Sequence, residues 1–227
     1  MNDTAVLSRR GFLKWTAGAA AGAAAACALP SIVAASNPTF RPIRCALAGT
    51  FNTTEATIIN QAVSLVANRM LDGRMFLWTR ARYRRWYATV PGRNFRSTAE
   101  FEAWFVRIQL AALSALGFPG MTIRSRYDPR GSWVGEAHVN RVRTEYFVVN
   151  GRNRPSVTGA FDITLNTGLL GNAQYHAGRN PAYWAGVITH EMLHNLGHEH
   201  PVGVYDGLFI RTYQRAVECN ANPQVRA

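Results

Sequence analysis

Carboxylates and lysines are scarce in this chain of 227 residues. Only 13 Asp and Glu face 25 Lys and Arg, which gives a formal net charge of +12, and Lys14 is the only lysine. A basic surface favours anionic partners such as membrane headgroups, wall polymers or nucleic acid, but a merely solvated surface has the same charge. We therefore keep an anionic surface or wall polymer as a candidate partner and expect no specific nucleic acid. The hydrophobic content of 48% excludes an intrinsically disordered chain.

The sequence also lacks internal repeats, a second domain boundary and a long apolar run. Its Ala- and Gly-rich stretch from Trp15 to Leu29 is too short to favour a transmembrane anchor. Before it stands Ser8-Arg9-Arg10-Gly11-Phe12-Leu13-Lys14, a pattern typical of a twin-arginine export signal. We expect a signal peptide over residues 1–35 and one domain over residues 36–227. The protein would then be periplasmic or secreted, and would contact a membrane only if the signal stays uncleaved.

Cysteine is rare, with three residues in all. Cys27 falls in the signal, which leaves Cys45 near the start of the domain and Cys219 near its end. In an oxidising compartment these two can pair and staple the termini, or they can remain two buried thiols. Spacing alone leaves both alternatives open. No segment is an obvious inhibitory element that would keep an enzyme latent. Cys45 can have that role only if it is not in a disulfide.

The sequence does contain a histidine-rich motif, H-E-x-x-H-x-x-G-x-x-H. Its fixed positions are His190, Glu191, His194, Gly197 and His200. Positions i and i+4 share a helix face, so His190 and His194 can reach one ion. Gly197 can end the helix in the left-handed conformation, and the chain can turn back to bring up His200. Three imidazoles suit Zn²⁺ with one open coordination position. Glu191 can then accept a proton from a metal-bound water.

This frame resembles that of the metzincin zinc metallopeptidases over residues 190–200. The resemblance implies zinc ligation by His190, His194 and His200, with Glu191 as general base. It also implies a mixed sheet with the metal helix behind it, a small C-terminal part, and an edge strand that holds an extended substrate by main-chain pairing. We take Thr144–Val149 as the candidate for that strand.

The sequence departs from the family in one respect: no methionine follows Met192, so the methionine turn below the metal is missing. An apolar floor can come from Leu208, Phe209 or Ile210. The chain is therefore a divergent relative by this criterion. Glu218 is a rival third ligand, because the gluzincin class adds a later glutamate to the same H-E-x-x-H pair.

The pattern of apolar residues predicts an α+β domain, a mixed sheet packed on two helices. A helix capped by Thr53 or Thr54 is expected to end near Leu71, and Ser97-Thr98-Ala99-Glu100 is a capping box for a second helix that ends near Leu116. The metal helix is expected to begin at Tyr183 or Trp184. Strands are predicted over 43–47, 121–126, 133–139, 144–149 and 160–165, with a turn at Asn150-Gly151.

Further polar residues near the motif have less defined roles. Tyr205 and Tyr213 are candidates to assist catalysis. His198 lies inside the motif but out of ligand position, so we expect it to face solvent. His138 and His176 can form a second metal site, although single histidines in strands or loops are more often structural or exposed.

The sequence thus predicts an exported zinc metallopeptidase that hydrolyses protein or peptide substrates. Two alternatives remain: a zinc hydrolase of cell-wall or other amides, and a non-catalytic zinc-bound binding protein. An intact Glu191 argues against the last, because a binding protein needs no carboxylate there.

Overall fold

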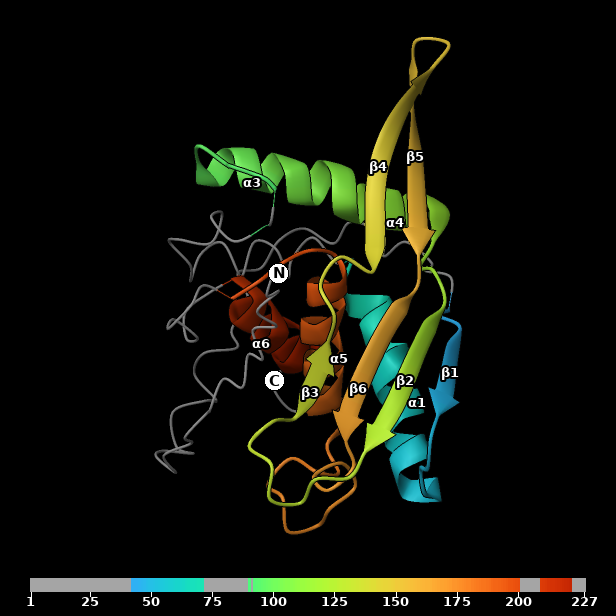
Figure 1. Ribbon diagram of the computed structural model, residues 1–227, viewed down its shortest axis with the longest axis vertical. Helices are drawn as coiled ribbons and strands as arrows, with labels where there is room; N and C mark the ends of the chain where they lie inside the picture. The colour runs from blue at the N-terminus through green and yellow to red at the C-terminus, as the bar shows by residue number, and fades with distance from the viewer. Residues whose placement is uncertain (1–41, 72–89, 91, 201–208, 222–227) are drawn as a thin grey trace, which may run out of the picture.

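The computed structural model of the protein describes residues 42–71, 90, 92–200 and 209–221. Its main sheet has the strand order β1-β2-β6-β3, formed by Cys45–Ala48, Met121–Arg126, Phe161–Asn166 and Gly135–Ala137 respectively. The first three strands are parallel, and β3 runs antiparallel to β6 (Figure 1). The predicted mixed sheet and α+β class are confirmed.

Alternating side chains give this sheet one apolar and one polar face. The buried apolar residues of β2 and β6 recur at every second position: Met121, Ile123, Phe161, Ile163 and Leu165. On the other face, Arg124 and Asp162 form an ion pair across neighbouring strands at 2.9 Å. Arg126 and Glu136 form another at 2.8 Å. In the described part of the chain, the apolar face of the sheet is therefore the one that helices cover.

Two helices pack behind the sheet, α1 (Thr53–Arg69) and α5 (Pro181–Asn195), and α6 (Phe209–Ala221) packs on α5 (Figure 1). The first predicted helix is confirmed, but its cap is Asn52 and not Thr53 or Thr54. Asn52 accepts a hydrogen bond from the Glu55 amide, and the Glu55 carboxylate accepts one from the Asn52 amide. A reciprocal capping box of this kind satisfies two helix-end donors at once.

The metal helix begins earlier than predicted. Asn180 caps it and Pro181 occupies its first position, where a residue without an amide hydrogen is tolerated. The predicted start at Tyr183 or Trp184 is wrong because hydrophobic periodicity alone marked it, whereas the cap lies in the preceding loop.

The second predicted helix is confirmed as a continuous helical segment in three parts, α3 (Thr98–Trp104), η2 (Phe105–Leu110) and α4 (Ala111–Leu116). Ser97 caps it as expected, and Gly117 ends it with a φ of 85°. The middle part is a π-helix, which the sequence did not predict. It contains Gln109, a buried residue that reaches the histidine motif.

The strand predicted over 144–149 exists, but in a different sheet. It belongs to β4 (Val142–Val149), which forms a two-stranded sheet with β5 (Arg152–Gly159). Asn150 and Gly151 both have positive φ, 52° and 71°, which gives the two-residue turn expected for a hairpin. Thr144–Val149 is therefore not an edge of the main sheet, and that expectation is corrected. The edge beside α5 is β3.

Cys45 is a free, half-buried thiol on β1, so the pairing of Cys45 with Cys219 that the sequence left open is not formed. Burial raises the pKa of the Cys45 thiol to about 11. A thiol that stays protonated at neutral pH is a poor metal ligand. In the described part of the chain, no helix has the length and apolar character needed to cross a membrane.

Candidate metal centre

Three imidazoles of the motif converge at the C-terminal end of α5. Gly197 adopts a φ of 98° directly after the helix and turns the chain, as predicted. One nitrogen from each of His190, His194 and His200 then lies within 4.8 Å of the others. His190 Nε2 and His200 Nε2 are 3.0 Å apart. Within the described residues, this is the one group of three or more His, Cys, Asp or Glu that could hold a metal ion. Glu218, the rival ligand, is outside it.

The orientation of His190 is set by α6. Its Nδ1 lies 2.9 Å from Gln214 Oε1, and Arg211 Nη1 donates to the same oxygen at 2.8 Å. A guanidinium only donates, so the atom of Gln214 between the two groups must be the amide oxygen. It follows that His190 carries its proton on Nδ1 and presents the lone pair of Nε2 to the centre. A hydrogen bond of this kind is the usual support for a metal-binding histidine.

His194 is oriented in the same way by the backbone. Its Nδ1 lies 2.8 Å from the carbonyl oxygen of His198. A carbonyl accepts and never donates, so Nδ1 again holds the proton and Nε2 is left with its lone pair. The turn at Gly197 thus brings up the third histidine and also supplies the group that orients the second.

Burial keeps these imidazoles neutral. It lowers the pKa of His190 well below the ordinary value, with further lowering by His194, His200 and Arg211. Burial also lowers the pKa of His194, and it lowers that of His200 to about 3 together with His194 and Arg211. Neutral imidazole is the form that binds a metal. The donor set therefore fits a divalent ion such as zinc at neutral pH.

Glu191 lies in a cleft of about 80 Å³ beside the imidazoles. Its wall includes His190 and Glu191 from α5, Arg211 and Gln214 from α6, and residues Ser132, Trp133, Val134 and Gly135 at the start of β3. Burial, and to a lesser degree the charge of Glu136, raises the pKa of Glu191 to about 8. A cation near such a carboxylate would favour its ionised form. The group is placed to exchange a proton close to neutral pH.

His198 does not face solvent, contrary to expectation. It is 1% exposed, and its ring packs among Phe101, Trp104, Phe105 and Phe209. Its Nε2 lies 2.7 Å from Gln109 Oε1, and Gln109 in turn donates to the Leu196 carbonyl at 2.9 Å. Burial, followed by His194, lowers the pKa of His198 to about 3. The residue is a buried support for the turn, and the expectation was wrong because sequence spacing does not reveal the aromatic helix that covers it.

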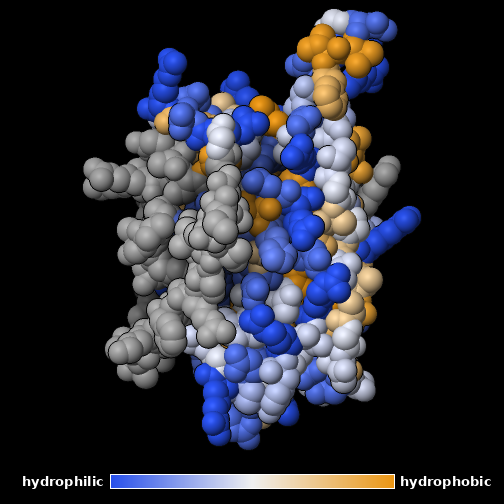
Figure 2. Space-filling view, viewed as in Figure 1, coloured by the Kyte–Doolittle hydropathy of each residue, from blue (hydrophilic) through white to orange (hydrophobic). Residues whose placement is uncertain are grey.

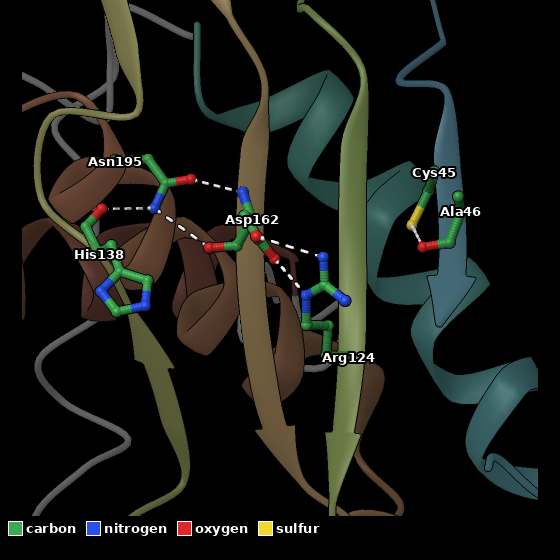
Figure 3. Close-up of polar contacts among 6 residues, drawn as sticks. All are labelled: Cys45, Ala46, Arg124, His138, Asp162 and Asn195. Carbon is green, nitrogen blue, oxygen red and sulfur yellow. Dashed lines mark hydrogen bonds and ion pairs between the residues drawn. The ribbon is translucent and has the colours of Figure 1, made fainter. Parts of the chain in front are cut away.

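Asn195, which sequence reasoning missed, fixes the end of α5 to the sheet. Its side-chain oxygen accepts from the Asp162 amide at 2.7 Å, and its nitrogen donates to the carbonyls of His138 and Asp162 at 3.0 and 3.3 Å (Figure 3). The residue is fully buried. Since it directly follows His194, these bonds hold the second imidazole in register with β6.

The remaining candidates take different positions. Tyr213 is buried and donates its hydroxyl to the Met70 carbonyl in the core, away from the cleft. Phe209 and Ile210 are buried, and Phe209 packs on His198. His138 and His176 are exposed and belong to no group of metal ligands among the described residues. Tyr205, Leu208, Cys27 and the signal segment lie outside the described residues.

Glu218 of α6 packs against α5 at Gly186, one helical turn before His190. Gly186 of α5 approaches it so closely that a methyl group at Gly186 would lie 3.1 Å from Glu218 Cβ. Burial raises the pKa of Glu218 to about 7, while Arg211 and Arg215 oppose the shift.

Tyr183 is a further cleft residue that sequence reasoning missed. It lines the cleft and shares a hydrogen bond of 2.8 Å with Tyr175. Its helical spacing from Val187 and His190 is a signal that could have found it.

Comparison with known proteins identifies the N-terminal segment. The family of TAT (twin-arginine translocation) pathway signal sequences matches residues 6–28. The chain is therefore exported by the twin-arginine route, to the periplasm or beyond. No curated protein and no solved structure matches the chain.

Proposed function

We propose that this exported protein is a zinc-dependent peptidase. The observation that carries the proposal is the convergence of three neutral imidazoles, the buried His190 and the half-buried His194 and His200. The buried Glu191 follows the first of them directly and lines a cleft together with it. The resemblance of residues 190–200 to the metzincin frame agrees with this arrangement, including the antiparallel strand β3 beside the metal helix.

His190, His194 and His200 would hold the ion through Nε2 of the first two and a ring nitrogen of the third. A zinc ion held there would act as a Lewis acid and lower the pKa of a water molecule toward neutrality. Glu191 would accept a proton from the attacking water and pass it to the leaving amine. Gln214 and the His198 carbonyl keep the two α5 imidazoles in the ligating tautomer.

The substrate would lie along β3. Among the described residues, β6 is the one strand that pairs with β3, and residues 132–135 line the cleft that contains Glu191. An extended peptide can pair with the backbone of such an edge and place a scissile amide near Glu191.

Metal analysis combined with a peptide-cleavage profile tests the proposal. The wild-type protein is expected to contain one zinc and to cleave peptides. Glu191→Gln should keep the zinc but lose at least roughly 100-fold in kcat. His194→Ala should lose both. Unchanged turnover in Glu191→Gln would contradict the mechanism.

Two outcomes would favour the alternatives. Cleavage of wall-peptide amides without cleavage of ordinary peptides would identify a cell-wall hydrolase. Zinc binding without any hydrolysis would identify a binding protein.

A further inference from the structure

The β4–β5 hairpin extends well beyond the body of the protein. Its base packs on α4, and β4 also contacts η2, while its far end reaches past the helices (Figure 1). The pairing is regular from Val142 opposite Gly159 to Val149 opposite Arg152, so the hairpin is a stiff ribbon and not a loose loop. Neither strand belongs to the main sheet, which packs on the metal helix α5.

The far end of the hairpin is apolar and exposed. Phe147, Val148 and Val149 are 52%, 71% and 51% exposed. Figure 2 shows hydrophobic and hydrophilic residues side by side at the far end of the hairpin. Scattered apolar side chains on a surface need no explanation, but three in succession at a projecting end indicate a surface that contacts another apolar phase.

Arginines line one face of this tip and form its basic collar. Arg154 lies opposite Phe147 and Arg152 opposite Val149, and cross-strand partners share a face of the hairpin. Arg143 follows farther along the same face, and all three arginines are exposed. Glu145 is the only carboxylate on either strand. The tip therefore joins apolar side chains to a collar of positive charge.

We propose that this tip docks on membranes rich in anionic lipid. Phe147, Val148 and Val149 enter the boundary between headgroups and acyl chains, while Arg152 and Arg154 bind lipid phosphates. Apolar side chains with a basic collar are the combination that binds anionic bilayer surfaces. The long alkyl stems of arginine allow the guanidinium to stay at phosphate level while the neighbouring side chain inserts.

Location and size favour a membrane over a protein partner. Twin-arginine export delivers the folded protein to the outer surface of the membrane it has just crossed. A two-stranded tip offers far less than the roughly 800 Å² per partner that a stable protein interface uses. A bilayer needs only a few apolar side chains and several cations. The inference does not depend on the proposed peptidase activity, and it adds a second membrane contact to the signal segment.

Vesicle binding of the exported protein tests the proposal. The probes are vesicles of phosphatidylcholine alone or with phosphatidylglycerol, and the readout is co-sedimentation. We expect strong binding only with phosphatidylglycerol, weakened by salt. Arg152→Gln with Arg154→Gln should weaken it by roughly 25-fold, since each surface arginine contributes about five-fold. Serine at positions 147, 148 and 149 together should weaken it by roughly 10-fold or more.

Matched controls separate docking from general charge and from misfolding. Arg130→Gln and Tyr127→Ser change exposed residues in the loop that follows β2, at the end of the molecule opposite the hairpin tip (Figure 1), and should bind vesicles as the wild type does. Each hairpin variant should keep its zinc content and melting temperature, because the tip contacts neither the core nor the metal centre.

Three results would overturn the proposal. Hairpin variants that bind as well as the wild type would exclude a role for the tip. Loss of binding in the arginine variant but not in the serine variant would show surface adsorption without insertion. A dimer in lipid-free solution that the serine variant abolishes would assign the tip to a second copy of the chain.

Discussion

At the scale of single residues, the two imidazoles on α5 are oriented by different kinds of acceptor. His194 uses a backbone carbonyl, which no substitution removes, whereas His190 depends on the side chain of Gln214. Arg211 holds that amide in place by donating to the same oxygen. The support of His190 is therefore the one that mutation can test directly.

Replacing Gln214 should weaken metal binding without removing a ligand. In Gln214→Leu, His190 loses the acceptor for its Nδ1 proton, so its tautomer and ring orientation are no longer fixed. We expect zinc affinity to fall about 10- to 100-fold, measured by competition with a chelator. Gln214→Glu keeps an acceptor and should lose much less. Equal losses in the two variants would show that packing, and not the hydrogen bond, supports His190.

Glu218 should make the stability of the protein depend on pH. Its folded pKa is about 7 against an ordinary value of 4.5, so between these values the folded state holds a proton that the unfolded state releases. The free energy of unfolding therefore falls as pH rises through this window, by roughly 1–3 kcal/mol from this group. Glu218→Gln should melt higher than the wild type at pH 8 and at the same temperature near pH 4.5.

Thermal melts across this range, with both proteins in the same metal state, measure the difference. Exposed Glu145→Gln is the control and should leave the wild-type curve unchanged. Parallel curves for wild type and Glu218→Gln would mean that Glu218 ionises normally in the folded protein.

The sequence could predict the clustering of the three histidines but not their supports. The spacing of His190, His194, Gly197 and His200 is local, and helix geometry with a glycine turn converts it directly into convergence. Gln214 lies 24 residues after His190, and Gln109 lies 89 residues before His198. Contacts of that range depend on tertiary packing, which no local pattern encodes.

At the scale of elements, the close approach of β3 to α5 forms one side of the cleft that Glu191 lines. A methyl group at Gly135 would lie 2.8 Å from Glu191 Oε1 and 3.0 Å from Val187 Cγ1. A side chain on this strand would therefore compete with the carboxylate for the same space. The absence of one allows an edge strand to run beside the metal helix.

Gly135→Ala should reduce activity more than stability. The Glu191 side chain can swing away from the added methyl at little cost, but it then leaves its position beside the metal centre. We expect kcat/KM on a cleaved peptide to fall at least roughly 10-fold, with zinc content unchanged. Gly120→Ala is the control, since a methyl there meets no atom within 4 Å. Full activity in Gly135→Ala would mean that Glu191 does not act from the position it has here.

Strands and turns were predicted well where the local sequence specifies them, and poorly where pairing with a distant strand specifies them. The 121–126 strand matches β2, and the Asn150-Gly151 turn forms, because alternation and turn residues specify them locally. Strand β5 was not predicted, since Arg152, Asn153, Arg154 and Pro155 are unusual strand residues. They are tolerated in a hairpin that projects from the body. The choice of β3 as the sheet edge rests on pairing with β6, which the sequence does not reveal.

At the scale of the whole molecule, the export route determines when any metal held by the three histidines would bind. The twin-arginine route carries folded protein, and the three imidazoles meet only when α5, the Gly197 turn and α6 have packed. An ion that binds this assembled centre and not the unfolded chain must stabilise the fold by mass action.

Removing the metal should therefore lower the melting temperature. With free zinc at 1,000 times its Kd, binding contributes about 4 kcal/mol, which corresponds to roughly 10 °C for a domain of this size. Scanning calorimetry of the zinc-loaded and chelator-treated wild type measures the shift, and adding zinc back should restore it. His194→Ala should melt near the chelated protein and respond to neither treatment. If the chelator leaves the wild-type melting temperature unchanged, the three histidines do not hold a metal in the folded protein.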